Sequence, residues 1–304
     1  MIGPAARDAL AAALDGSVRF GVPLARYTSL RLGGPADALA APGDRKELAR
    51  TLALCRELEL PVLVLGNGFN TLVRDGGVDG VVLRLHRFRA LRRTPEGDLA
   101  AEAGVTHATL TRHCVEHGLA GLEFGAGIPG TIGGWVAMNA GVPEREVKDA
   151  LRGIELADAA GARRCVPREG LPFRYRSAGL PAGAVVVAAS FAVRDAEREA
   201  VRAEVERHLA KRARTQPLDI PSCGSVFKNP PGEFAGRLIE QAGLKGARVG
   251  GAEISPVHAN FIVNRGGASG ADVLALIELA RTRVREDTGF ELEPEVRIVG
   301  REAA

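Results

Sequence analysis

Two hydrophobic periodicities alternate along the first part of the chain. After Asp44, a typical N-cap residue, apolar side chains recur on one helical face at Leu48, Leu52, Cys55 and Leu58. The apolar runs 62–66 and 81–85 that follow are typical of buried strands. Residues 1–85 therefore predict a small α/β unit.

Short strand-like runs dominate the middle of the chain. They are separated by turn residues and occupy 99–104, 153–158, 162–166 and 184–193. One helix interrupts them, from Thr106 to His117, with Gly118 as its C-terminal glycine. A charged helix at 195–214 follows, and Pro217 and Pro221 stop it. Residues 86–215 therefore predict a second, mainly β unit that ends at a domain boundary.

The last part, residues 216–304, mixes both periods. We expect helices near 234–242 and 270–288, and strands at 259–264 and 296–300. Together the three parts predict an α+β protein with three units, 1–85, 86–215 and 216–304.

Composition narrows the class of protein. Of the 304 residues, 46% are hydrophobic and 25% are charged, which is ordinary for a folded protein with a sizeable core. The 38 glycines and 17 prolines imply many tight loops. A net charge of +3 is too small to indicate nucleic-acid binding. No apolar run is long enough to cross a membrane, and no signal-peptide pattern opens the sequence.

The cysteines and histidines show no metal-ligand spacing and no disulfide framework. The four cysteines, Cys55, Cys114, Cys165 and Cys223, lie far apart in the sequence. We therefore expect a reduced, cytoplasmic protein without a bound metal.

Two glycine-rich loops are candidates for phosphate binding. The loop 66–70, with sequence GNGFN, directly follows a predicted strand, where glycines let backbone N–H groups approach a diphosphate. An ordinary turn is the alternative. The segment 125–130, GAGIPG, fits the dinucleotide pattern GxGxxG, but Pro129 stands where that motif's helix should begin, and no strand leads into it. We therefore reject a Rossmann site there.

Three further segments carry candidate chemistry. FRYRSAG (173–179) places Tyr175 beside Arg176, whose permanent charge suits a carboxylate or a developing enolate. SCGSVFKNP (222–230) holds Ser225, which can donate a proton, but it does not resemble a hydrolase elbow. LEPEV (292–296) places Glu293 and Glu295 on the same side if the segment is a strand. For each segment alone, an exposed structural role is the alternative.

In this order, the segments resemble the UDP-N-acetylenolpyruvoylglucosamine reductase family. The matching stretches cover about residues 20–300 and are YTSLRLGGPAD (27–37), VLGNGFNTLVRDGGVDGVVLRL (64–85), GIPGTIGGWVAMNAG (127–141), FRYRSA (173–178), CGSVFKNP (223–230), 235–264 and LEPEVRIVG (292–300). The resemblance implies a two-subdomain, vanillyl-alcohol-oxidase-like FAD-binding fold followed by an α+β substrate-binding domain. It also implies FAD as cofactor and NADPH as hydride donor. The implied reaction is the reduction of UDP-N-acetylglucosamine enolpyruvate to UDP-N-acetylmuramate for peptidoglycan synthesis.

The same resemblance assigns residues to roles. It implies Arg176, Ser225 and Glu295 as catalytic residues, with Ser225 as the proton donor. The implied FAD contacts are Arg31, Gly66, Asn67, Gly68, Phe69, Asn70, Ile128, Pro129, Gly130, Thr131, Gly133 and Gly134. The weaker substrate contacts are Tyr175, Arg214, Lys228, Asn229 and Glu240.

This chain departs from the family in three places. Phe69 stands where a serine is usual, and NAGVPERE (139–146) replaces the commoner NAGAYGGE. Only 48 residues separate Arg176 from Ser225, so the chain resembles the short, type II form that lacks a tyrosine loop. Arg212 or Arg214 would then help to clamp the substrate. A monomer is expected, because the family builds its site within one chain.

Three alternatives remain open at this point. The chain could be another FAD oxidoreductase of the same fold that acts on a hydroxy acid or a sugar, although the segments 223–230 and 292–296 argue against it. It could be a flavin-binding protein without catalysis. It could also be an α/β protein with glycine-rich loops and no cofactor.

Overall fold

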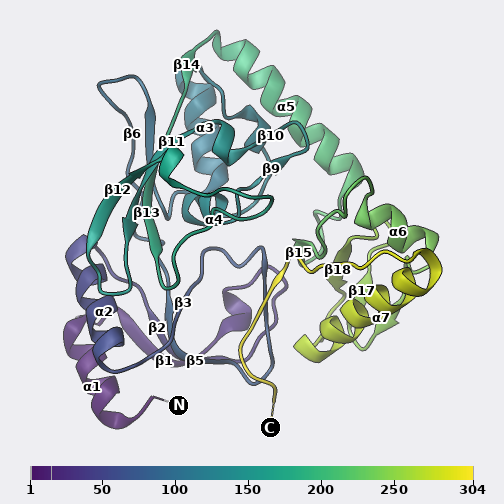
Figure 1. Cartoon of the computed structure of the whole chain (residues 1–304), viewed down its shortest axis with the longest axis horizontal. Coiled ribbons are helices and arrows are strands. Elements are labelled where there is room, and N and C mark those ends of the chain that lie inside the picture. Colours follow the sequence, from purple (N-terminus) through teal and green to yellow (C-terminus); the bar gives the residue numbers. More distant parts are fainter. Residues whose placement is uncertain (1, 15, 304) are drawn as a thin grey trace. The chain divides into compact units, whose positions relative to one another are not determined.

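The computed structural model describes residues 2–14 and 16–303 (Figure 1). Their contacts define two compact units, each built from three segments of the chain. Unit 1 comprises residues 1–20, 38–66 and 80–212, and unit 2 comprises 21–37, 67–79 and 213–304. The sequence predicts three domains, 1–85, 86–215 and 216–304, which are defined by the cofactor or substrate that each would bind. That division stays a prediction.

The N-terminal part of unit 1 is an α/β layer. Its four-stranded sheet has the order β1-β2-β5-β3, in which β3 and β5 run parallel. The elements are α1 (Pro4–Ala13), β1 (Val18–Pro23), β2 (Pro35–Ala40), α2 (Arg45–Glu57), β3 (Val62–Val64) and β5 (Val78–Leu83). The Asp44 carboxylate accepts hydrogen bonds from the backbone N–H groups of Lys46 and Glu47 at 2.7 and 2.8 Å, so the predicted N-cap is confirmed.

The second part of unit 1 is a five-stranded antiparallel sheet with helices packed on it (Figure 1). The strand order is β12-β11-β13-β7-β6. Its elements are β6 (Leu91–Arg93), β7 (Leu99–Glu102), α3 (His107–His117), α4 (Ile132–Ala137), β11 (Leu151–Ala157), β12 (Arg163–Pro167), β13 (Val185–Phe191) and α5 (Arg198–Thr215). Trp135 of α4 and Phe191 of β13 lie in the core between these layers. Gly118 ends α3 with φ +61°, as the sequence predicts.

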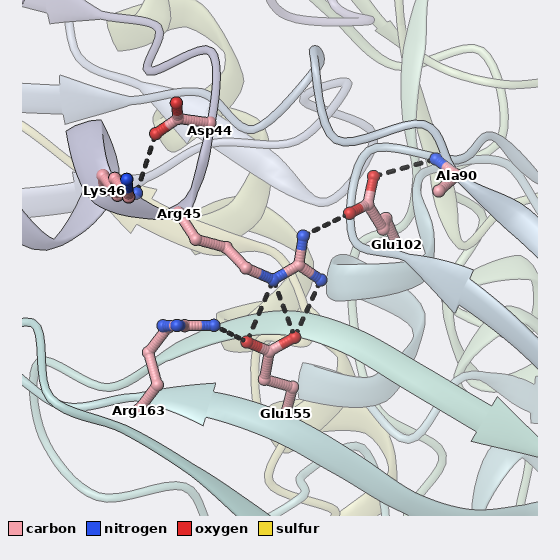
Figure 2. A network of polar contacts seen from close by, with 7 residues as sticks. All are labelled: Asp44, Arg45, Lys46, Ala90, Glu102, Glu155 and Arg163. Atoms are coloured by element: carbon pink, nitrogen blue, oxygen red, sulfur yellow. Dashed lines mark hydrogen bonds and ion pairs between the residues drawn. The ribbon is translucent and has the colours of Figure 1, made fainter.

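An ion-pair network joins the two parts of unit 1 (Figure 2). Arg45, the first residue of α2, forms a bidentate contact with Glu155 of β11, at 2.8 and 3.1 Å. Its Nη1 also donates to Glu102 of β7. Glu155 accepts a further hydrogen bond from Arg163 at 2.6 Å, and Glu102 accepts the N–H of Ala90 at 2.8 Å. Helix α2 is thus fixed to two strands of the second sheet.

Unit 2 is an α+β body with its own hydrophobic core. A sheet of order β15-β18-β17-β16 packs with two helices, and β19 pairs in parallel with β4. The bounds are β4 (Thr71–Val73), β15 (Ser222–Ser225), α6 (Ala235–Gln241), β16 (Arg248–Val249), β17 (Ala252–Ile254), β18 (Phe261–Asn264), α7 (Gly270–Thr288) and β19 (Arg297–Val299). A capping box formed by Ser269 and Asp272 starts α7, and Gly289 ends it with φ +76°.

Most long elements agree with the sequence predictions, so the α+β class is confirmed. The pattern missed α1, and it missed α4 inside the glycine-rich run. The remaining elements are short: η1 (Leu24–Arg26), β8 (Leu119–Ala120), η2 (Glu123–Gly125), β9 (Gly141–Val142), β10 (Arg145–Glu146), η3 (Val147–Asp149), η4 (Arg168–Gly170) and β14 (Arg194–Asp195). Within the described ranges, no helix is both long and apolar enough to span a membrane.

Candidate functional site

The glycine-rich run of unit 1 combines packing glycines with turn glycines. A Cβ at Gly125 would lie 2.3 Å from the Trp135 ring, and a Cβ at Gly133 would lie 3.1 Å from the Cβ of Ala103. These two glycines therefore let α4 pack closely on its neighbours. Gly130, in contrast, adopts φ +125°, a backbone conformation that residues other than glycine rarely adopt.

Unit 1 also brings the two predicted phosphate loops together. A Cβ at Gly66 would lie only 2.8 Å from the Thr131 hydroxyl, although the two residues are far apart in sequence. Gly134 in the first turn of α4 is exposed. Apart from the helix's own backbone, the atom nearest to a Cβ placed there would be the Thr131 hydroxyl oxygen, at 3.8 Å. The backbone here leaves open space over small residues. A flat, phosphorylated cofactor fits such a cradle.

The second half of the GNGFN loop belongs to unit 2. A Cβ at Gly68 would lie 2.4 Å from the carbonyl of Tyr27, so only glycine fits there. Ser29 donates to the Gly68 carbonyl from both its N–H and its hydroxyl, at 3.1 and 3.0 Å. Phe69, which departs from the family pattern, is 37% exposed. The loop is thus held through its backbone, and the phenylalanine side chain is not needed to shape it.

Hydrogen bonds in unit 2 join this loop to both predicted catalytic segments. The Asn70 side chain donates to the Glu295 carbonyl at 3.1 Å. The Glu295 N–H donates to the carbonyl of Val226 at 2.8 Å, one residue after Ser225. A Cβ at Gly224, just before Ser225, would lie 3.7 Å from the Phe69 carbonyl. The segments that carry Asn70, Ser225 and Glu295 therefore adjoin one another within unit 2.

Ser225 is the last residue of β15 and pairs with Phe261 of β18. Cys223, two residues earlier, is buried, and burial raises its pKa to about 12. The Glu295 carboxylate adds to this rise, so it lies within electrostatic reach of β15. The segment 291–296 is not a strand. The side chains of Glu293 and Glu295 were expected on the same side only if it were one, so that expectation does not apply.

Arg176 lies in unit 1 in a constrained turn. Its backbone has φ +56°, and its guanidinium stacks on the Tyr175 ring at 4.6 Å. Its Nη1 lies 3.5 Å from the Glu146 carboxylate. Glu146 also binds the Lys148 ammonium at 2.7 Å and accepts a hydrogen bond from the fully buried Asn139 at 2.9 Å.

Glu146 and Asn139 were missed as functional candidates, although both lie in the 139–146 segment that departs from the family pattern. Asn139 also donates to the Arg174 carbonyl at 3.1 Å. The pair therefore fixes the backbone just before Arg176 and one side of its guanidinium. In the sequence, Asn139 and Glu146 are polar residues seven positions apart. No periodicity of apolar and polar residues sets them apart from other polar loop residues.

The remaining predicted contacts occupy varied positions. The Asn229 side chain accepts the N–H of Ala235 at 3.1 Å and so helps to start α6. Lys228 forms an ion pair with Glu293, and Glu240 forms one with Lys245. The other members are exposed: Arg31, Tyr175 and Arg214.

The two arginines considered as substrate clamps differ in their surroundings. A Cβ at Gly127, in the loop that also holds Ile128 and Pro129, would lie 2.9 Å from Arg212 Cδ. The Arg212 Nε is buried and has no hydrogen-bond partner among the described residues. Burial lowers the pKa of this guanidinium. Arg214, by contrast, is exposed on α5.

Comparison with known proteins agrees with this picture. Residues 36–166 match the family "FAD binding domain", and residues 216–299 match "UDP-N-acetylenolpyruvoylglucosamine reductase, C-terminal domain". A protein named UDP-N-acetylenolpyruvoylglucosamine reductase from Anaeromyxobacter dehalogenans (strain 2CP-C) is 50% identical over 97% of this chain and 89% of its own length. One of the same name from Geotalea uraniireducens (strain Rf4) is 44% identical over 97% and 98%.

Solved structures extend the similarity to the fold. The crystal structure of UDP-N-acetylenolpyruvylglucosamine reductase from Thermus caldophilus matches with a TM-score of 0.80 and 38% identity, over 93% of this chain and 98% of that one. Phl p 4.0202, titled a glucose dehydrogenase, matches 64% of this chain and 44% of its own with a TM-score of 0.51 and 14% identity. That second likeness concerns the fold alone.

Proposed function

The chain belongs to the UDP-N-acetylenolpyruvoylglucosamine reductase family, and we propose that it uses NADPH to reduce UDP-N-acetylglucosamine enolpyruvate to UDP-N-acetylmuramate. The chain is an FAD-dependent oxidoreductase. The observation that best supports the specific reaction is the meeting of the segments that carry Asn70, Ser225 and Glu295 in unit 2. A loop of the cofactor type and the two segments that carry groups suited to enolate chemistry are joined there by one side-chain and one backbone hydrogen bond.

The proposed cofactor contacts follow from the two glycine-rich loops. Gly66, Asn67, Gly68, Phe69 and Asn70 would hold the diphosphate through backbone N–H groups. The second loop would lie against the flavin, and its members are Ile128, Pro129, Gly130, Thr131, Gly133 and Gly134. Arg31 would add a charge. When bound, FAD accepts a hydride from NADPH and passes it to the substrate.

The proposed protein chemistry concerns the charge that develops on the substrate. Hydride addition to the terminal vinyl carbon leaves negative charge on the adjacent carbon and its carboxylate. Arg176 would stabilise that charge with a fixed cation, and Glu295, if protonated, would donate a hydrogen bond to it. Ser225 Oγ would then give its proton to the adjacent carbon and regain one through Lys228 or a water.

We propose the nucleotide part of the substrate as the ligand of the more exposed groups. These are Tyr175, Arg214, Lys228, Asn229 and Glu240. We also propose that the protein acts as a monomer in the cytoplasm. The four cysteines are free thiols, which supports a reducing compartment.

Separate measurement of the two half-reactions tests the role of Ser225. Under anaerobic conditions, Ser225→Ala should be reduced by NADPH at nearly the wild-type rate. Reoxidation by the enolpyruvyl substrate should be slower by about 10²–10⁴-fold, the usual contribution of a general acid. Ser222→Ala, in the same strand, is the matched control and should leave both half-reactions unchanged. Equal slowing of both half-reactions in Ser225→Ala would contradict the proton-donor role.

If wild-type flavin is reduced by NADPH but is not reoxidised by this substrate, the proposed reaction is wrong, while the fold and the cofactor stand.

A further inference from the structure

Basic side chains gather on one face of the first sheet of unit 1. Val18, Leu83 and Leu85 lie in the core that packs on α1 and α2. Side chains alternate along a strand, so Arg19, Arg84 and His86 lie on the opposite face. The backbone pairing continues beyond the end of β5, because the Arg84 N–H donates to the Ala40 carbonyl at 2.9 Å. Strand β1 and the segment that follows β5 thus bring cationic groups together on one side of the sheet.

These groups line a cavity of about 170 Å³. Its walls are Gly16, Ser17, Arg19, Leu39, Ala41, Arg84, His86 and Arg87. None of these lining residues is acidic. Arg87 is held among these residues by hydrogen bonds that it donates to the Ser17 hydroxyl at 2.7 Å and the Ala41 carbonyl at 3.5 Å. Three of the cavity's eight lining residues are arginines, and one of them, Arg87, is held in place by hydrogen bonds.

His86 has an unmet hydrogen-bond requirement in this cavity. Its Nδ1 is buried and has no hydrogen-bond partner among the described residues. Burial lowers the pKa of His86, and the charges of Arg84, Arg89, Arg87 and Arg19 lower it further. A buried polar atom without a partner costs free energy, and an anion would remove that cost by accepting a hydrogen bond.

We propose that this cavity binds a phosphoryl group, either as inorganic phosphate or as the terminal phosphate of a larger ligand that extends outward. Arginine forks match phosphate oxygens, and three arginines balance a multiply charged anion better than a single carboxylate. The volume of about 170 Å³ is below the roughly 300–1,000 Å³ of sites that enclose drug-sized ligands. The cavity therefore suits a phosphate and does not enclose a whole nucleotide.

The cavity is distinct from the proposed flavin contacts, because none of them lines it. Arg84 is the one link, since its Nη2 lies 3.5 Å from the Gly66 carbonyl. A test should therefore vary Arg19 and Arg87 and leave Arg84 intact. Both are exposed, so their substitution should not unfold the protein.

The experiment titrates the FAD-loaded full chain with inorganic phosphate at low ionic strength, where charge interactions are least screened. Binding is followed by calorimetry and by the His86 ring proton resonance, assigned with His86→Gln. The flavin absorbance is recorded in parallel. The test protein is Arg19→Gln/Arg87→Gln. Arg56→Gln/Arg92→Gln removes the same charge outside the cavity and is the matched control.

We expect saturable binding to the wild type with unchanged flavin absorbance and a raised pKa of His86. Affinity should fall about tenfold or more in Arg19→Gln/Arg87→Gln, as expected for the loss of charge-assisted contacts, and by less than about twofold in the control. A nucleoside monophosphate that binds more tightly than phosphate would identify the source as a larger ligand. The proposal is wrong if the wild type shows no saturable binding, if both double variants lose affinity equally, or if phosphate displaces the flavin.

Discussion

Arg45→Met tests whether the ion-pair network of Figure 2 holds the two layers of unit 1 together. Methionine keeps the length and apolar stem of the side chain near Phe88, whose ring centre lies 5.8 Å from the guanidinium carbon. It removes the bidentate contact to Glu155 and the contact to Glu102. The partly buried carboxylates of Glu155 and Glu102 then lose the positive charge of Arg45 that helps to offset their own.

The magnitude follows from burial. Glu155 and Glu102 are 19% and 16% exposed, whereas Arg45 is 34% exposed. A hydrogen bond to a charged group contributes about 1.5–3 kcal/mol, and an exposed ion pair contributes about 0–1 kcal/mol. The network lies between these cases, so we expect Arg45→Met to lower the free energy of unfolding by about 2–3 kcal/mol. Arg163→Met, whose arginine is 44% exposed and forms an ion pair with Glu155, should cost about 0.5 kcal/mol.

Urea unfolding followed by the fluorescence of Trp135 measures this effect. Trp135 is the only tryptophan in the chain and is buried in unit 1, so it reports on the relevant body. Combining Arg45→Met with Glu155→Gln should show a coupling of about 1 kcal/mol or more. If Arg45→Met costs no more than Arg163→Met, or if the coupling is absent, the network does not carry the stability assigned to it.

The same network predicts a pH dependence. Burial alone would raise the pKa of Glu155, but the hydrogen bonds from Arg45 and Arg163 outweigh it and lower the pKa. A lowered pKa stabilises the fold above the pKa of the unfolded state, about 4.3, and that contribution is lost as the pH falls through the folded value. The stability difference between wild type and Arg45→Met should therefore shrink in acid, and a constant difference would contradict this reasoning.

Three further predictions concern packing, positioning and thiol reactivity. Gly125→Ala should destabilise unit 1 by about 1–3 kcal/mol in the same urea assay, because its Cβ would lie 2.3 Å from the Trp135 ring; a neutral result would disprove the packing role. Glu146→Gln should slow flavin reoxidation by the substrate about tenfold through a less well-held Arg176, while flavin reduction by NADPH stays nearly normal; slowing of both would indicate a general structural defect. Ellman's reagent should modify one thiol rapidly in the native protein, the exposed Cys165, and three more only on unfolding; Cys165→Ser should abolish the fast phase.

Hydrophobic periodicity predicted most of the long elements, with α1 as an exception, because apolar residues recur on the face that such an element buries. Helix α7 shows this well: Val273, Ile277 and Val284 are all buried at the spacing that the sequence displays. Helix α4 was missed for the opposite reason. It has six residues, two of them glycine, and the close packing of Gly133 on Ala103 rather than helix propensity holds it in place.

The residues of the candidate site also fall into two groups, those that sequence motifs predict and those that only the structure reveals. Ordered motifs and the family resemblance predict Ser225, Glu295 and Arg176 as reacting groups, because reacting groups must be particular residue types, and these roles stay predictions. Glu146 and Asn139 were not identified, since their importance lies in what they hold. A carboxylate that contacts Asn139, Lys148 and Arg176 at once has no sequence signature beyond being a glutamate in a loop. Residues that position others become recognisable only through distances.

The glycines of the run 125–134 also differ in what they contact. The family resemblance implies FAD contacts between Ile128 and Gly134, yet the glycines of this run have different physical roles. Gly125 and Gly133 are needed for close contacts within the protein, whereas Gly134 is exposed and a Cβ there would make only an ordinary contact, 3.8 Å from the Thr131 hydroxyl. An alanine at Gly125 should therefore impair folding even without flavin, while an alanine at Gly134 should weaken flavin retention and leave the stability of the flavin-free protein nearly unchanged. The ranking of these two variants by flavin content and by urea midpoint separates a scaffold glycine from a ligand-facing one.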